Sequence, residues 1–95
     1  MSYQVLFSPE AQTDLLDLYD YIAERSNADR ALAYVNRIQE RCCGLQKFPE
    51  RGHRRDDIRP GLRVMGFEHR VSVAFRIDPG RVTILRILYA GRDFR

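Results

Sequence analysis

The stretch RVSVAFRIDPGRVTILRILYA, residues 70–90, decides the fold. Its first half alternates apolar and polar side chains, which predicts a strand with one face against a core. The turn sequence Asp78-Pro79-Gly80 predicts a hairpin at this point. Residues 81–90 then return as a nearly continuous apolar run, which is typical of an interior strand that is covered on both faces.

Two helices are predicted upstream of this hairpin, after a short strand at Tyr3–Phe7. Ser8 and Pro9 indicate the start of the first helix, because serine is a favoured N-cap and proline fits the first helical position. Asn27 is the expected N-cap of the second helix. Each helix has an apolar stripe at helical spacing. The first stripe consists of Ala11, Leu15, Leu18, Tyr19 and Ile22, and the second of Ala28, Ala31, Leu32, Val35, Ile38, Cys42 and Leu45.

A basic loop, 48–60, connects the helices to a strand at Leu62–Phe67 that precedes the quoted hairpin. The chain therefore reads β-α-α-β-β-β. We predict an α+β fold in which a helix hairpin packs on one face of a mostly antiparallel four-stranded sheet. With 95 residues the chain can bury one modest core, so we expect a single domain over residues 1–95.

Composition limits the cellular setting and the chemistry. No apolar run reaches the roughly 20 residues of a membrane span, and the N-terminus lacks a signal segment, so we expect a cytoplasmic protein without membrane contact. The adjacent Cys42 and Cys43 are not expected to pair, which suits a reducing compartment. His53 and His69 lack further ligands at workable spacing. We therefore expect no metal and no cofactor.

Charge is distributed unevenly along the chain. Residues 1–48 hold five Lys and Arg against seven Asp and Glu, whereas residues 49–95 hold eleven against six. Fifteen of the sixteen basic residues are arginine. The planar guanidinium group of arginine can form two parallel hydrogen bonds with one carboxylate or phosphate group. Arginine-rich codon usage explains the choice of arginine equally well, but it does not explain the difference between the two halves.

Arg86 interrupts the apolar run of the last strand. An unpaired charge in a core would cost several kcal/mol. We therefore expect Arg86 on the open face of the sheet, without a buried partner, beside Arg70 and Arg76 and, depending on register, Arg63. Asp14, Asp17 and Asp20 follow one another at helical spacing, and we expect them to form a solvated helix face.

The whole chain resembles the RelE/ParE superfamily of bacterial toxins in its element order and in several short motifs. These motifs are Ser8-Pro9-Glu10-Ala11 after the first strand, Phe48-Pro49 with Gly52, Arg59-Pro60-Gly61-Leu62-Arg63, and Leu88-Tyr89-Ala90-Gly91-Arg92-Asp93-Phe94. The glycine-arginine-aspartate ending is most similar to the ParE branch. That resemblance implies a toxin of a type II toxin–antitoxin system that poisons DNA gyrase by binding and is neutralised by a ParD-like antitoxin.

For this function we expect the target-binding surface to centre on Arg86, Arg92 and Phe94, because these residues are the hardest to explain as determinants of the fold. The antitoxin is expected to bind exposed apolar surface along the helix hairpin and the sheet edge. No catalytic residue is needed in this mechanism.

The sister branch, which resembles RelE, implies a ribosome-dependent messenger-RNA endoribonuclease as the alternative. Its candidate residues are Arg59, Arg63, Arg86 and Tyr89, since RNA cleavage needs cations and a group that transfers a proton. Phe94 stands where a titratable ring is expected, and phenylalanine cannot transfer a proton. The neighbours Glu68 and His69 are better explained as a hairpin tip.

A separate nucleic-acid-binding module is the third possibility, and it rests only on the basic second half of the chain. Both predicted helices are balanced or acidic, so neither is typical of a recognition helix. We therefore expect no direct sequence-specific DNA binding by this chain.

Overall fold

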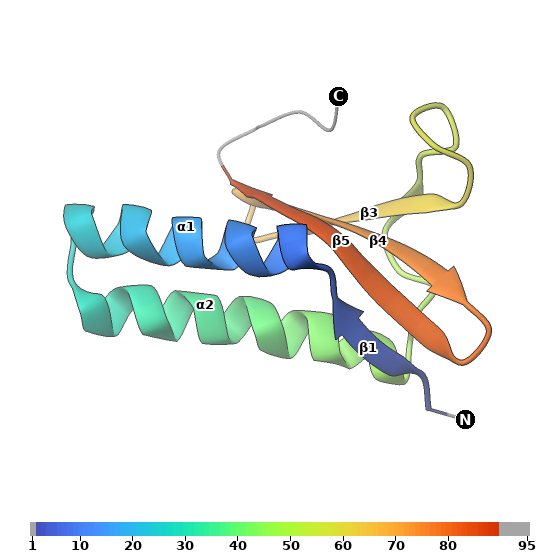
Figure 1. Ribbon diagram of the computed structural model, residues 1–95, viewed down its shortest axis with the longest axis horizontal. Helices are drawn as coiled ribbons and strands as arrows, with labels where there is room; N and C mark the ends of the chain where they lie inside the picture. Colours follow the sequence, from blue (N-terminus) through green and yellow to red (C-terminus); the bar gives the residue numbers. More distant parts are fainter. Residues whose placement is uncertain (1, 90–95) are drawn as a thin grey trace.

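The computed structural model describes residues 2–89 and contains two helices on a curved sheet (Figure 1). Its elements are β1 (Gln4–Phe7), α1 (Pro9–Arg25), α2 (Ala28–Cys43), a short 3-10 helix η1 (Gly44–Gln46), β2 (His53–Arg54), β3 (Leu62–Phe67), β4 (Val71–Asp78) and β5 (Arg81–Tyr89). The predicted α+β architecture with a helix hairpin is confirmed.

The sheet has five strands in the order β1-β5-β4-β3-β2. Strand β1 runs parallel to β5, and all other neighbours are antiparallel. The last strand of the chain therefore lies inside the sheet, as the apolar run predicts. The two-residue strand β2 is an addition to the four predicted strands. Its sequence, His53-Arg54, lies in the basic loop and has no apolar alternation that would identify it.

Both helix starts have the predicted caps. The Ser8 side chain accepts a hydrogen bond from the Ala11 amide at 3.0 Å, and Asn27 Oδ1 accepts one from the Arg30 amide at 2.8 Å. Only Ser26 and Asn27 separate the end of α1 from the start of α2. The two helices lie side by side and run in opposite directions (Figure 1).

The core lies between the helix hairpin and one face of strands β3, β4 and β5. Its largest fully buried side chains are Phe75, Ile38, Leu45, Ile84, Val73, Val82 and Cys42. Burial raises the pKa of the Cys42 thiol to about 12, so this thiol stays protonated at neutral pH. Leu32, which the stripe of the second helix placed in the core, instead points outward and is 53% exposed.

Alternation along the strands assigns each arginine to a face of the sheet. Arg76 lies opposite Leu62 and Thr83 on the open face, as predicted, and is paired with Asp78 at 3.0 Å. The expectation for Arg70 is wrong. This residue lies in the turn before β4 and lines a hollow beside α2 rather than the open face.

Strand β5 contains a bulge that the sequence does not reveal. Ala74 is opposite Arg86, whereas the next residue of β4, Phe75, is opposite Ile84, so Leu85 is the extra residue. The bulge lets Ile84 and Ile87 both face the core although they are three positions apart. It also places Arg86 beside Ala74 on the open face.

Candidate functional site

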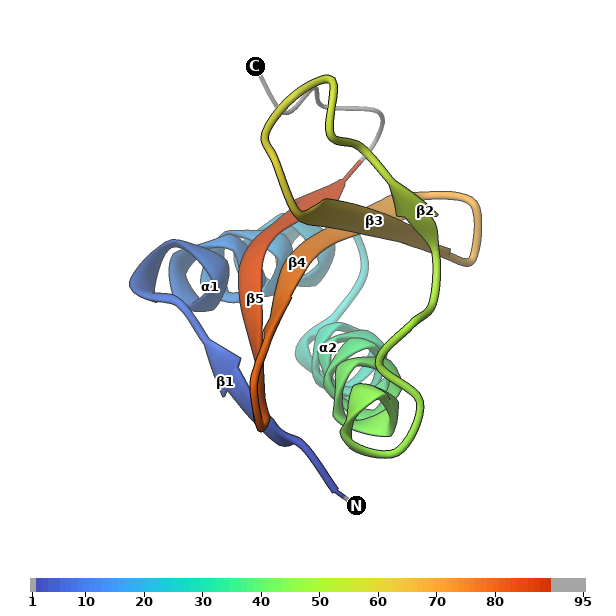
Figure 2. The same cartoon turned by 90° about the vertical axis from the view of Figure 1, so that its right-hand side faces the viewer.

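The open face of the sheet carries a hollow of about 390 Å³, which we call the arginine hollow. Its lining residues are Ser8, Glu10, Ile58, Arg59, Leu62, Ala74, Leu85 and Arg86. The loop at 55–61 forms one wall, and it lies on the side of the sheet away from α2 (Figure 2). The bulge of β5 and the start of α1 form the opposite wall.

Arg86 in this hollow has a partner, which corrects the expectation that it needs none. Its Nε and Nη2 atoms donate to the two carboxylate oxygens of Asp14, at 2.8 and 3.0 Å. The Asp14 side chain is only 9% exposed, whereas that of Arg86 is 46% exposed. Hydrogen bonding to Asp14 raises the pKa of the Arg86 guanidinium above its ordinary value. Arg86 is therefore a fixed cation with one open side.

Asp14 also corrects the expectation of a solvated acidic helix face. Besides Arg86 it accepts a hydrogen bond from the Ile87 amide at 2.8 Å. Sequence reasoning missed this role because Asp14 and Arg86 are 72 positions apart. The only available signal was a charge in an apolar strand, which requires a partner of opposite sign somewhere in the fold.

Ser8 bonds to two carbonyl groups at the bulge. Its amide donates to the Ile84 carbonyl at 2.9 Å and its hydroxyl donates to the Leu85 carbonyl, also at 2.9 Å. The same hydroxyl oxygen caps α1. Together Ser8 and Asp14 therefore attach the beginning of α1 to the bulge and hold the arginine hollow in shape.

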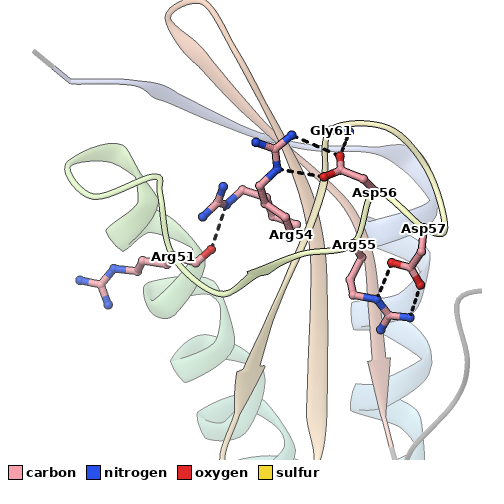
Figure 3. Close-up of polar contacts among 7 residues, drawn as sticks. Arg51, Arg54, Arg55, Asp56, Asp57 and Gly61 are labelled. Atoms are coloured by element: carbon pink, nitrogen blue, oxygen red, sulfur yellow. Dashed lines mark hydrogen bonds and ion pairs between the residues drawn. The ribbon is translucent and has the colours of Figure 1, made fainter.

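The loop that forms the other wall is held by its own ion pairs (Figure 3). Arg54 Nε donates to Asp56 at 3.0 Å, and Arg55 donates to both carboxylate oxygens of Asp57 at 3.0 Å. Asp56 also accepts a hydrogen bond from the Gly61 amide at 2.8 Å, which closes the loop. The two aspartates therefore neutralise part of the positive charge of this loop.

These contacts lower the pKa values of both aspartates. The Gly61 amide, and after it Arg54, lowers the pKa of Asp56, while Arg55 lowers that of Asp57. Both carboxylates are therefore charged at neutral pH. Arg59 differs, because within residues 2–89 it has no carboxylate at ion-pair distance. It adds a second guanidinium to the hollow, whose lining residues include one carboxylate, that of Glu10.

The other predicted site residues lie elsewhere. Arg63 is opposite Phe75 on the helix side of β3, and it donates to the Arg51 carbonyl at 3.1 Å. Tyr89 lies in a second hollow, which we call the tyrosine hollow, beside α2. Among the residues that line this hollow are Arg30, Tyr34, Arg37, Glu68, Arg70 and Tyr89. Arg92 and Phe94 are outside the described residues.

Comparison with known proteins gives the context for this geometry. The family model described as the ParE toxin of the type II toxin–antitoxin system parDE matches residues 5–94. The chain belongs to the ParE toxin family.

Two curated relatives support this assignment to the ParE family. Toxin ParE3 of Caulobacter vibrioides is 36% identical over 75 residues, which cover 79% of this chain and 74% of that protein. Toxin ParE1 of Mycobacterium tuberculosis is 28% identical over 93 residues, covering 98% of this chain and 95% of that protein.

Solved structures agree with the ParE assignment. A chain of the chromosomal ParDE system from P. aeruginosa superposes with a TM-score of 0.82 at 28% identity, covering 94% of this chain and 97% of that one. A chain of the RelBE2 toxin–antitoxin complex of Mycobacterium tuberculosis shares the fold, with a TM-score of 0.67 at 22% identity over 94% of this chain and 99% of its own length.

Over residues 2–89, the structure contains neither a cluster of metal-ligating side chains nor a membrane-spanning helix. No group of three or more histidine, cysteine, aspartate or glutamate side chains is placed to hold a metal ion. Neither described helix has the length and apolar character needed to span a bilayer.

Proposed function

We propose that this ParE-family toxin acts by binding DNA gyrase, performs no chemistry itself, and is neutralised by a ParD-like antitoxin in the cytoplasm. The observation that carries this proposal is the separation of the four candidate ribonuclease groups. Arg59 and Arg86 share the arginine hollow, whereas Arg63 is on the helix side of the sheet and Tyr89 is in the tyrosine hollow. A cleavage site needs its proton-transferring group and its cations around one phosphate.

The groups that do meet in the arginine hollow favour binding. Arg86 is oriented by Asp14, and Arg59 is free of carboxylate partners among the described residues. Two guanidinium groups line this hollow together with apolar side chains and one carboxylate, that of Glu10. Such a pair of guanidinium groups suits an anionic group on a target protein. We propose that Arg86, together with Arg92 and Phe94 beyond it in the sequence, forms the target-binding surface.

Removal of the end of the chain tests this proposal. A protein truncated after Ala90 should remain folded, because the described strands end at Tyr89, and should no longer arrest growth. The full-length double variant Arg92→Ala, Phe94→Ala should behave in the same way. Thermal unfolding followed by circular dichroism checks the fold, and colony formation after induction checks toxicity.

Two assays with purified protein separate the proposed target from the alternative. Supercoiling by gyrase should be inhibited by the wild type and spared by the Arg92→Ala, Phe94→Ala variant. Messenger RNA on translating ribosomes should remain intact with both. A truncated protein that stays fully toxic, or messenger cleavage without any effect on gyrase, would replace this proposal with the RelE-like one.

For the antitoxin, we propose a groove on the outer side of the helix hairpin, which we call the hairpin groove. It has a volume of about 400 Å³ and is lined by Gln12, Leu15, Leu16, Tyr19, Leu32, Val35, Asn36 and Gln39. Leu16 and Leu32 are 67% and 53% exposed, respectively. Such large exposed side chains on facing helices are typical of a surface that receives an amphipathic segment of a partner.

Placing a charge in the hairpin groove should weaken antitoxin binding. We expect Leu16→Asp and Leu32→Asp each to weaken the toxin–antitoxin complex by about 100-fold, because the carboxylate would be buried against apolar atoms. Calorimetric titration measures this effect. The control is Phe48→Asp, which places the same charge at a position that is 62% exposed but outside the groove. If all three variants bind the antitoxin as the wild type does, the groove is not its site.

A further inference from the structure

The tyrosine hollow is a second site, separate from both the arginine hollow and the hairpin groove. It has a volume of about 490 Å³ and lies between the helices and the turn that joins β3 to β4. The ring of Tyr34 forms edge-to-face contacts with Phe67 and Tyr89, at centroid distances of 5.8 and 6.4 Å. The Arg37 guanidinium lies 5.1 Å from the centroid of the Tyr34 ring. This wall of the hollow is therefore rigid and aromatic.

Charge in the tyrosine hollow is unbalanced. Arg30, Arg37 and Arg70 all line it, together with one carboxylate, that of Glu68. Glu68 is already engaged, because its two oxygens accept hydrogen bonds from Arg37 at 3.0 and 3.2 Å. Within residues 2–89, neither Arg30 nor Arg70 has a carboxylate at ion-pair distance. Two guanidinium groups of the hollow therefore remain available to an anion.

Glu68 and His69 are the central residues of the turn between β3 and β4. Both φ values are positive, 48° and 61°, as in the type I′ turns that join hairpin strands. The Arg70 amide closes the turn by donating a hydrogen bond to the Phe67 carbonyl at 3.2 Å. The turn holds Glu68 at the edge of the hollow, where it pairs with Arg37 in an ion pair that is about half exposed.

Tyr34 contributes a neutral hydrogen-bond donor. Burial, and after it Glu68 and Tyr89, raises the pKa of its hydroxyl, while Arg37 and Arg70 oppose this shift. The hydroxyl is therefore protonated at neutral pH and can donate to an anion. Arg30 and Arg70 line the same hollow. A guanidinium group can donate two parallel hydrogen bonds to the two oxygens of a carboxylate, so these groups together suit a carboxylate ligand.

The charge of α1 disfavours a long polyanion. Asp17, Asp20 and Glu24 are exposed on this helix, and the first 48 residues have more acidic than basic side chains. A nucleic-acid backbone that extended from the hollow along α1 would be repelled by these carboxylates. A peptide needs only one carboxylate at the hollow and can cover the rest with neutral side chains, so the charges favour a peptide.

We propose that the tyrosine hollow binds an aspartate or glutamate side chain of the antitoxin, between Arg30 and Arg70. This inference rests on the proposed function, since it adds an ionic contact to the apolar one in the hairpin groove. Both sites use side chains of α1 and α2, but they lie on different faces of α2, so a partner segment that occupies both must pass around this helix. The apolar groove supplies affinity, and the ionic contact fixes the register of the segment.

Two charge-removing variants test the inference. Arg30→Gln and Arg70→Gln should each raise the Kd of the complex with the purified antitoxin by about tenfold, as expected for loss of a hydrogen bond to a charged group. The matched control is Arg81→Gln, which removes the same charge at the other end of β4 and β5. Its Kd should stay within about twofold of the wild type. Circular dichroism verifies that all variants are folded.

A double-mutant cycle identifies the partner group. Each acidic residue of the antitoxin is replaced by its amide, and one replacement should weaken binding to the wild type about tenfold but hardly affect binding to Arg70→Gln. The inference fails if Arg30→Gln and Arg70→Gln bind like Arg81→Gln, or if no acidic position is coupled. It also fails if a single-stranded RNA oligonucleotide, rather than the antitoxin, shifts the Tyr34 and Tyr89 ring signals in NMR spectra.

The two proposals fail in different ways. If Leu16→Asp weakens antitoxin binding as expected while Arg70→Gln binds normally, only the ionic contact is overturned. If the wild type does not bind the antitoxin at all, the proposed function and this inference are overturned together.

Discussion

Replacing Asp14 by alanine is expected to lower the free energy of unfolding by about 3 kcal/mol. The carboxylate is nearly buried and accepts three hydrogen bonds, two from Arg86 and one from the Ile87 amide. Removal of the carboxylate leaves the Ile87 amide without its hydrogen-bond acceptor and the Arg86 guanidinium without its ion-pair partner. Arg86 is partly exposed and can turn towards water. The loss of stability should therefore lie at the lower end of the range that is typical when one partner of a buried ion pair is removed.

Chemical denaturation followed by circular dichroism measures this loss. The control is Asp17→Ala, one turn further along α1, where the side chain is exposed; its stability should change by less than about 0.5 kcal/mol. A cycle with Arg86→Ala isolates the pair, since the second substitution should cost little once Asp14 is gone. Equal effects of Asp14→Ala and Asp17→Ala would show that the contact does not stabilise the fold.

Replacing Gly52 by alanine should destabilise the protein by about 3 kcal/mol or more, because two penalties combine. Gly52 has a φ of +73°, which is unfavourable for alanine. An added Cβ atom would also lie 2.2 Å from the carbonyl oxygen of Val64, a backbone atom that cannot rotate away. Since His53 pairs with Val64, relief of the clash requires separation of β2 from β3.

Gly61→Ala is the matched control for this prediction. Gly61 also has a positive φ, +80°, but no atom lies within 4 Å of the position of an added Cβ. Its replacement should cost only the conformational penalty, about 1–2 kcal/mol. Denaturation curves compare the two variants, and amide hydrogen exchange at His53 reports on the β2–β3 pairing. If Gly52→Ala and Gly61→Ala lower the free energy of unfolding equally, then movement of the loop relieves the contact between the added Cβ atom and the Val64 carbonyl oxygen.

Local patterns were sufficient to predict most of the fold. The alternation at 71–78, the turn at 78–80 and the caps Ser8 and Asn27 each depend on neighbouring residues, and the structure contains all of them. Strand β2 could not be predicted, since two exposed residues have no periodicity. Leu32 was assigned to the core because its stripe is wider than the surface that the sheet covers.

The site depends on contacts between distant residues, and there prediction from the sequence was weaker. The bulge at Leu85 shifts the alternation of β5, and no residue type marks it. The pairing of Asp14 with Arg86 follows from that shift. Similarly, Arg70 belongs to the tyrosine hollow because the turn before β4 directs it there, whereas a regular strand would have placed it on the open face.

The position of β5 has a consequence for how the toxin folds. This strand lies between β1 and β4, and its bulge holds the beginning of α1 through Ser8 and Asp14. Until β5 is in place, β1 is not joined to the rest of the sheet and these contacts to α1 are missing. Because β1 and β5 are far apart in the sequence, closing the sheet in this way slows folding. A protein that recognises the folded surface of the toxin can therefore bind only chains into which β5 has already been inserted.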